Sequence, residues 1–353
     1  MNLKTENANE VRRREILILW ECEKCNPNGD AITNEPRHDV YGYAYVTPDR
    51  IKRNIRDRLM EIVGRDQVFV TTEPITIKSR LSEKLKQKQN QDKDTSTENK
   101  KGKKAVDKEE YLKALKEFID NRLFGFTYAS DVSLSEPGPV QFTFAKSLHP
   151  VDIVPDKGNG GFATTDSSGN TKEGRTFRLS YFIPYAILAA SGVVNQYRAE
   201  KTDMSEEDYR LMRKAWWESF NSVASRSKIG QRPLLWLEIV YDGDYYIGNL
   251  HNFLEITVKE PNIYSYFSEN KPHSIKDIII DFTPLFEVLE GKGKIKLYTP
   301  YEKLYIAHSR QEAEENNKPF VIPPKYTLIS DEEMYTISKN NKNQITENTD
   351  EEK

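Results

Sequence analysis

The sequence predicts an α+β fold in which a βαββαβ order, ferredoxin-like or RRM-like, is interrupted by two large insertions. Three observations support this fold class. Residues 15–23 form a continuous apolar run of strand length, amphipathic helices are expected to begin after Thr47 and Ser205, and two polar stretches separate the remaining apolar segments. With 353 residues, 37% of them hydrophobic, the chain is long enough to bury a substantial core.

The first strand and helix have clear local signals. The run at 15–23 ends in an Asn/Pro/Gly turn, which indicates a buried central strand. Thr47 is expected to cap a helix whose first position is Pro48, where the missing N–H costs nothing. One arc of this helix is apolar and the neighbouring arc is cationic. The apolar residues are Ile51, Ile55, Leu59 and Ile62, and the cations are Lys52, Arg53 and Arg56.

Two polar stretches are predicted to be insertions. Residues 81–108 have almost no apolar side chains, so burial cannot offset the entropy of ordering them, and we expect this segment to be disordered. Residues 157–175 are rich in Gly and polar side chains. The elements expected around them are a helix at 109–123, a half-buried strand at 139–148 with Val140, Phe142 and Phe144 on one face, and a strand at 176–188.

The last third of the chain is expected to complete the sheet. The helix after Ser205, with Asp208 in its first turn, ends in a basic loop at 225–233, and a strand at 234–241 follows directly. Further strands are expected at 275–282 and 294–298. Residues from 331 onward are predicted to form a solvated acidic tail.

The net charge of -3 argues against a nucleic-acid binder if it is taken as an average. The charge is segregated, however. Residues 78–104 hold ten Lys/Arg against four acids, a net +6, whereas 330–353 hold seven acids against three Lys, a net -4. Since no apolar run reaches the ~18 residues of a membrane helix and the N-terminus has no apolar leader, we expect a cytoplasmic protein without membrane contact.

Two residue groups could hold a metal. Cys22 and Cys25 have the spacing of zinc or redox pairs, but no second Cys pair exists, so free thiols are favoured. Asp30, Glu35 and Asp39 could bind Mg²⁺ for phosphodiester cleavage. The favoured alternative is a turn at 26–30, in which Asn and Asp bond their own backbone and Gly supplies a positive φ.

A series of short motifs occurs in a fixed order between residues 15 and 250. They are NPNGD at 26–30, NEPR at 34–37, VT at 46–47, IKRNIRD at 51–57, RLFG at 122–125, GPVQF at 138–142, SLH at 147–149, VDI at 151–153, PYA at 184–186 and SRSKIGQ at 225–231. In order and spacing they resemble the guide-RNA-binding backbone subunit, family seven, of type I CRISPR Cascade effector complexes. The likeness is greatest to the I-B branch, with the I-C branch second. Ala31 departs from the usual proline, and Cys22 and Cys25 are not a feature of the family.

The resemblance implies a right-hand shape with an RRM-like palm, a finger insertion and a thumb hairpin that reaches a neighbouring subunit. The corresponding segments are 12–68 (first part of the palm with the basic helix), 69–123 (finger insertion with a disordered basic tip), 124–149 (palm strands), 150–175 (thumb hairpin), 176–250 (palm strand, second helix and last strand), 251–330 (C-terminal extension of the palm) and 331–353 (disordered acidic tail).

The resemblance also implies a non-catalytic subunit that binds and protects crRNA and presents it for pairing with target DNA in antiviral defence. No catalytic residue, metal or cofactor is implied. The implied partners are crRNA, the target DNA strand, further copies of the chain in a filament, and the large, small and guide-end-binding Cascade subunits. The RNA-contacting residues carried over are Arg37, Thr47, Asp49, Lys52, Arg53, Arg56, Arg226, Lys228 and Gln231, with Phe162 near the thumb tip, where bases are displaced.

Two alternative functions stay open at this point. One is a metal-dependent ribonuclease like the type III backbone subunits, with Asp30 or Asp39 as a metal ligand. The other is a generic single-stranded RNA-binding protein outside CRISPR systems. A nuclease assay with Mg²⁺ distinguishes the ribonuclease from a Cascade subunit. The genomic neighbourhood of the gene distinguishes the generic RNA-binding protein from a Cascade subunit.

Overall fold

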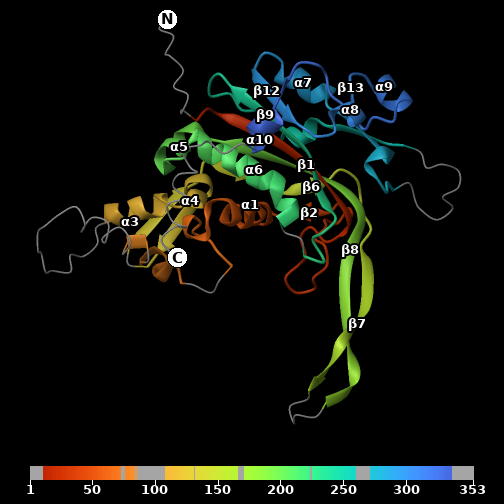
Figure 1. The fold of residues 1–353 in the computed structure, drawn as a ribbon. Helices are drawn as coiled ribbons and strands as arrows, with labels where there is room; N and C mark the ends of the chain where they lie inside the picture. The colour runs from red at the N-terminus through yellow and green to blue at the C-terminus, as the bar shows by residue number, and fades with distance from the viewer. Residues whose placement is uncertain are drawn as a thin grey trace, which may run out of the picture.

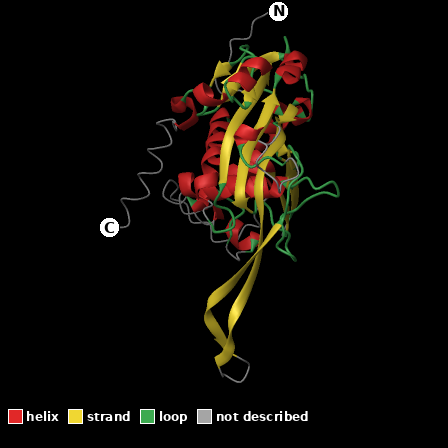
Figure 2. Ribbon diagram, turned by 90° about the vertical axis from the view of Figure 1, so that its right-hand side faces the viewer, coloured by secondary structure: helices red, strands yellow, loops and turns green. Residues whose placement is uncertain are grey.

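The computed structural model describes residues 11–72, 76–82, 84–85, 108–130, 132–165, 171–222, 225–259 and 271–335, without the side chains of 159–165, 171–177 and 302–303. A nine-stranded sheet forms the body, with helices on one face and most of the C-terminal third on the other. A long hairpin extends away from this body (Figures 1 and 2). The predicted α+β class is therefore confirmed.

Strand β1 (Arg14–Cys25) lies at the centre of the nine-stranded sheet. It pairs antiparallel with β8 (Thr171–Val194) on one side and with β9 (Gln231–Tyr241) on the other. The predicted central strand is confirmed, and its continuous apolar run follows from burial on both faces. The sheet order is β15 (Thr327–Leu328), β12 (Gly293–Tyr298), β9, β1, β8, β6 (Ala145–Ser147) and β2 (Tyr45–Val46), while β5 (Val140–Phe142) and β7 (Val154–Thr165) also pair with β8.

Helices α1 (Pro48–Val63) and α6 (Glu206–Ser222) lie side by side and cover one face of this sheet (Figure 1). Both begin as the sequence predicts. Thr47 Oγ1 accepts a hydrogen bond from the Arg50 N–H at 3.2 Å, and Ser205 and Asp208 cap the start of α6 reciprocally. Ile51, Ile55 and Leu59 of α1 are buried, and a short helix that was not predicted, α5 (Gln196–Thr202), precedes α6.

Side chains of β1 alternate between two cores. Ile16, Ile18 and Trp20 pack in the core under the helices, whereas Leu17 and Leu19 pack against the C-terminal third. The predicted strands at 275–282 and 294–298 are present as β11 and β12, but 275–277 form a single 3₁₀ turn. The C-terminal elements are η2 (Leu250–Phe253), β10 (Glu255–Val258), β11 (Ile278–Asp281), α7 (Thr283–Leu289), α8 (Glu302–Tyr305), β13 (Ile306–Ala307), α9 (Arg310–Glu315) and β14 (Phe320–Val321).

The segment expected to form a finger, 69–123, contributes to a small separate core, and two expectations fail there. Leu81 is fully buried against Leu115 and Phe118, so this end of 81–108 is packed, while 86–107 lie outside the described residues. Tyr128 belongs to the same core, because 125–137 fold into a separate two-stranded sheet instead of joining the palm strands. The elements in and next to this segment are η1 (Arg65–Gln67), α3 (Lys108–Lys116), α4 (Ile119–Phe124), β3 (Gly125–Ala129) and β4 (Ser133–Pro137), so the helix expected at 109–123 is divided in two.

The single strand expected at 139–148 is also divided, into β5 and β6. At the break, Thr143 N donates to Ser191 O at 2.8 Å, but the Ser191 N–H donates to the Thr143 hydroxyl at 3.0 Å and not to a main-chain carbonyl. This side-chain bond interrupts the main-chain hydrogen bonding to β8, and the alternation of buried and exposed side chains is broken at the same point. Val140 and Phe142 are buried as predicted, whereas Phe144 is 58% exposed.

The expected thumb insertion is a long β-hairpin. Strands β7 and β8 pair antiparallel from Val154 opposite Phe182 to Thr165 opposite Thr171. Strand β8 then continues without a break into the main sheet, so the boundary expected at residue 175 falls inside a strand. One continuous strand thereby connects the projecting hairpin to the core.

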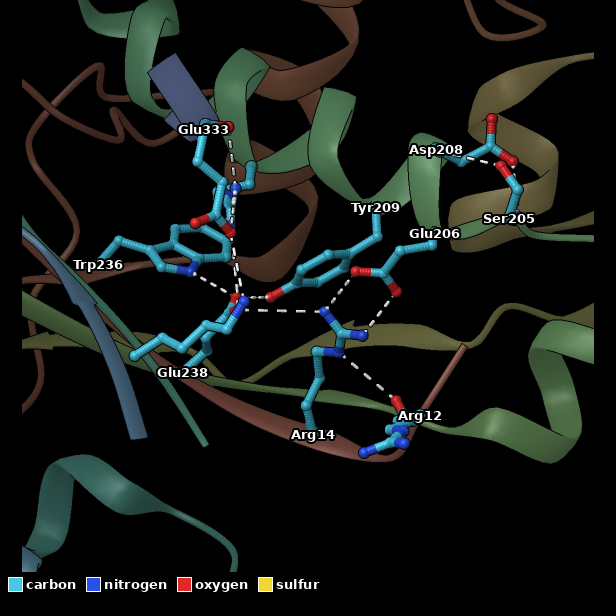
Figure 3. Close-up of polar contacts among 11 residues, drawn as sticks. Arg12, Arg14, Ser205, Glu206, Asp208, Tyr209, Trp236, Glu238 and Glu333 are labelled. Carbon is cyan, nitrogen blue, oxygen red and sulfur yellow. Dashed lines mark hydrogen bonds and ion pairs between the residues drawn. The ribbon is translucent and has the colours of Figure 1, made fainter. Parts of the chain in front are cut away.

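A buried charged cluster fastens α6 to the sheet (Figure 3). Arg14 on β1 donates to both carboxylate oxygens of Glu206, at 3.1 and 2.6 Å. Arg213 on α6 lies 3.5 Å from Glu238 on β9 and 3.5 Å from Glu333. Burial by itself would raise the pKa of Glu238, but the charges of Arg14 and Arg213 lower it. The two neighbouring arginines therefore favour the charged form of Glu238 although it is buried.

Glu333 belongs to a C-terminal helix, α10 (Asp331–Tyr335), where a solvated tail was expected. Met334 is buried, the Tyr298 hydroxyl donates to Asp331 at 2.8 Å, and Lys214 of α6 donates to the Tyr335 carbonyl at 2.7 Å. The expectation is wrong for 331–335, because these residues find both apolar and charged partners. The remainder, 336–353, lies outside the described residues.

Candidate nucleic-acid interface

Two loops, the base of the hairpin and the start of α1 meet at one end of the sheet. The Glu23 N–H donates to the Gly230 carbonyl and the Asn26 N–H donates to the Ser227 carbonyl, each at 2.8 Å. These bonds extend the β1–β9 pairing into the loops, which places the segment after β1 beside the loop at 225–231. Residues separated by two hundred positions are thereby brought together.

The loop after β1 is built from two tight turns. Asp30 Oδ1 accepts the Ile32 N–H at 2.9 Å, and Asp39 Oδ1 accepts the N–H groups of Tyr41 and Tyr43, each at 2.9 Å. These main-chain bonds are the leading cause that lowers the pKa of both carboxyl groups. The interpretation of Asp30 as a turn residue, which the sequence favoured, is therefore confirmed.

The role predicted for Gly29 in this loop is wrong. Gly29 is not among the residues with a positive φ, and Asn34 has the left-handed conformation instead, with a φ of 59°. Gly29 is needed for a close approach, since a Cβ there would lie 2.9 Å from Asn34 Oδ1.

Arg37 and Arg226 flank this end of the sheet. Arg37 lies 3.3 Å from Asp30 and its side chain is 30% exposed. Arg226 is 60% exposed and contacts Asp156 at the base of the hairpin, at 2.8 Å. Gln231, in contrast, is held between neighbours, because it accepts the Trp20 indole N–H and donates to the Lys228 carbonyl, each at 3.2 Å. The two arginines can therefore turn toward a ligand more readily than Gln231 can.

Lys228 and Arg50 form a pair of half-buried cations. Lys228 Nζ donates to the Asn26 carbonyl at 2.6 Å. Burial, followed by the charge of Arg50, lowers the pKa of Lys228 to about 8. Burial is also the main cause that lowers the pKa of Arg50, whose Nε and Nη2 atoms have no hydrogen-bond partner among the described residues. An anion such as a phosphate, bound next to these side chains, would offset the cost of burying each positive charge.

Arg50 was not among the residues that the sequence predicted to contact RNA. The signal available was its position three residues after the helix cap Thr47, which places a cation beside the first turn of α1. Thr47 is occupied as the cap, and Asp49 is exposed in the first turn. Thr47, Arg50 and Lys228 thus lie together at the start of α1.

The cations further along α1 are occupied by internal contacts. Arg56 makes an ion pair with the fully buried Asp120 of α4 at 2.9 Å, and Lys52 donates to Gln141 at 2.8 Å. Both lie against the Phe124 ring, at 5.0 and 5.5 Å from its centre. Arg53 pairs with Asp57 one turn on. Their phosphate contacts stay predictions, and any such contact must compete with these bonds.

Phe162 belongs to β7, but its side chain lies outside the described part of the structure. Cys22 and Cys25 are free, buried thiols, as the sequence favoured. Within the described ranges, no three His, Cys, Asp or Glu side chains gather closely enough to hold a metal ion. None of the helices in those ranges has the length and apolar character needed to cross a membrane.

The family model for the CRISPR-associated protein Cas7 matches residues 12–283. The chain belongs to the Cas7 family. A curated relative in the same family, the CRISPR-associated protein Cas7 of Haloferax volcanii, is 32% identical over 306 residues, which cover 79% of this chain and 83% of the relative. The family predicted from the motifs is thus confirmed, whereas the I-B branch stays a prediction.

Chains from two solved structures are also similar to this Cas7 protein. One comes from a structure titled CRISPR RNA-guided surveillance complex, pre-nicking, with 14% identity and a TM-score of 0.49 over 82% of this chain and 92% of that chain. The other comes from a CRISPR RNA-guided surveillance complex, with 14% identity and a TM-score of 0.42 over 82% of this chain and 89% of that chain.

Proposed function

We propose that this chain is a non-catalytic backbone subunit of a type I CRISPR Cascade complex, closest to the I-B branch, which binds crRNA and presents it for pairing with target DNA. Membership of the Cas7 family supports the assignment. The single observation that carries the RNA contact is the pair of half-buried cations, Arg50 and Lys228, at the start of α1. A phosphate of the RNA backbone supplies the anion that this pair lacks.

The finer architecture is proposed on the same basis. The strand order β9-β1-β8-β6 with antiparallel neighbours, and the helices α1 and α6 on one face, support an RRM-like palm. The hairpin of β7 and β8 is the thumb that reaches a second copy, so that copies line one RNA in a cytoplasmic filament with the other Cascade subunits.

The absence of nuclease activity is part of the proposal. The carboxylates of Asp30 and Asp39 hold the turns described above, and each also lies near a cation, Arg37 at 3.3 Å and Lys146 at 3.0 Å. Carboxylates used in this way are poorly placed to share one metal ion. Sequence-independent contacts to phosphate and delegated base pairing therefore account for the function without catalysis by this chain.

The proposal is tested by co-purification of the chain with its RNA, RNA sequencing, and binding of the identified RNA by an Arg50→Ala, Arg226→Ala variant. The variant should bind more weakly and its affinity should depend less steeply on salt, because phosphate contacts are lost. Lys294→Ala on β12, an exposed lysine, is the matched control. Recovery of random cellular RNA in place of CRISPR-derived RNA favours the generic RNA-binding alternative, and an unchanged salt slope contradicts the assigned contact.

A further inference from the structure

An aromatic face lies at the β2–β6 edge of the main sheet, and the contacts proposed above do not use it. Tyr45 pairs with Lys146 and Val46 pairs with Ala145. Val46 and Ala145 are buried in the core under the helices, so Tyr45 and Lys146 point to the opposite face of the sheet. Phe144 joins them there, with its ring 6.0 Å from the Tyr45 ring at an interplanar angle of 65°.

The turn before β2 lies beside this face, since Asp39 of the turn pairs with Lys146 at 3.0 Å. Lys146 Nζ lies 4.2 Å from the centre of the Tyr43 ring. The N–H groups of Tyr41 and Tyr43 are fixed by Asp39, and Gly42 adopts a φ of +82°, which only a residue without a side chain adopts readily. We call Tyr41, Tyr43, Tyr45, Phe144 and Lys146 the aromatic platform.

Tyr41, Phe144 and Lys146 of the aromatic platform are exposed, and Tyr43 and Tyr45 are half-buried, although hydrogen bonds order the main chain of the turn. Just after β6, Leu148 is half-buried against the core shared with the C-terminal third. The C-terminal third does not cover Phe144, which is 58% exposed, or Tyr41, which is 77% exposed. Large exposed rings held by a hydrogen-bonded turn are typical of a binding surface, because little ordering entropy is lost when a ligand arrives.

We infer that the aromatic platform stacks unpaired bases of a single-stranded nucleic acid, with Lys146 beside the backbone phosphate. Flat rings next to a cation suit a base and its phosphate. Lys146 also pairs with Asp39 at 3.0 Å, yet its side chain is 47% exposed and its ammonium has three donors. The platform also continues the candidate interface, since the Tyr45 N–H donates to the Arg37 carbonyl at 2.9 Å.

This inference rests on the proposed function and adds base stacking to its phosphate contacts. The bases can belong to the guide RNA or to the target DNA strand, because both present the same unpaired aromatic faces. A protein surface is the competing occupant, favoured by the exposed Val40 at the tip of the turn. Lys146 and the continuity with Arg37 favour a nucleic acid.

The test measures binding of Phe144→Ala and Tyr41→Ala variants to labelled single-stranded RNA and DNA of 20 nucleotides by fluorescence anisotropy at several salt concentrations. Both side chains are exposed, so the fold should be retained. Tyr246→Ala, at a 53% exposed tyrosine outside the platform, is the matched control. We expect about tenfold weaker binding for each stacked base lost, with the salt slope unchanged because no phosphate contact is removed.

Each outcome is decisive. A selective loss with RNA assigns the platform to the guide, and a selective loss with DNA assigns it to the target strand. Affinity equal to that of Tyr246→Ala overturns the inference but leaves the proposed function standing, provided that the unmodified protein binds RNA. Normal nucleic-acid binding with smaller assemblies, or a reduced salt slope, also overturns base stacking. Failure of the unmodified protein to bind RNA refutes the proposed function itself.

Discussion

Lys228 allows the proposed phosphate contact to be tested through pH. Burial and the charge of Arg50 lower the pKa of Lys228 to about 8 in the free protein. A phosphate beside the ammonium favours its charged form and raises that pKa. RNA binding must therefore take up a proton wherever Lys228 is partly neutral beforehand, and the affinity should fall as the pH rises through about 8.

The size of the effect follows from the shift. If the bound phosphate restores the ordinary pKa of 10.5, proton linkage gives an affinity about tenfold lower at pH 9 than at pH 7, with most of the loss above pH 8. Unfolding does not explain such a loss. Because the pKa of Lys228 is lower in the folded chain than in the unfolded chain, this residue makes the fold more stable as the pH rises from about 8 to 10.5.

The assay is fluorescence anisotropy with one labelled RNA at constant ionic strength between pH 7 and pH 9. Lys228→Arg keeps a cation that does not titrate in this range, so its affinity should stay nearly constant. Lys294→Arg, on the exposed surface of β12, should behave like the unmodified chain. A flat profile for the unmodified chain, or an equal fall in Lys228→Arg, would show that the reasoning about Lys228 is wrong.

Three further predictions concern the other contacts. Arg56→Ala should lower the free energy of unfolding in urea by about 3 kcal/mol, because it leaves the buried Asp120 without its cation, whereas Arg53→Ala should change it by less than about 0.5 kcal/mol. Replacement of 158–174 by a short turn should stop assemblies from growing with RNA length in light scattering, while single-copy RNA binding remains. Guide-directed RNA cleavage with Mg²⁺ should be absent, and cleavage that Asp39→Ala abolishes would contradict this.

The sequence predicted those helices and strands whose capping residues or apolar pattern lie within the element itself. Thr47 and Ser205 cap helices through bonds to residues three positions away, so the signal and its partner lie in one short segment. Strand β1 was predictable because burial on both faces leaves a continuous apolar run. The motifs between residues 26 and 231 identified the family, which the family match confirmed.

Long-range contacts decided the points on which sequence analysis failed. The cationic face of α1 appeared free because Asp120, the partner of Arg56, lies 64 residues later on α4. Alternation along one strand predicted that Phe144 faces inward. Its side chain is exposed instead, because the bond between the Thr143 hydroxyl and Ser191 of β8 interrupts the strand just before it. Leu81 appeared to be part of a polar insertion, although it packs into a small core with Phe118.

The sequence by itself determined the α+β class, the central strand, the two capped helices and the Cas7 family, because each depends on short local signals and on their order along the chain. Only the tertiary structure decided which lysine and arginine side chains can still donate hydrogen bonds to a ligand. The charge of a side chain is set by its residue type, but burial and partners from distant segments set its pKa and its free donors. Arg50 on α1 and Lys228 in the loop before β9 are 178 positions apart, yet the fold brings them close enough for the charge of Arg50 to lower the pKa of Lys228.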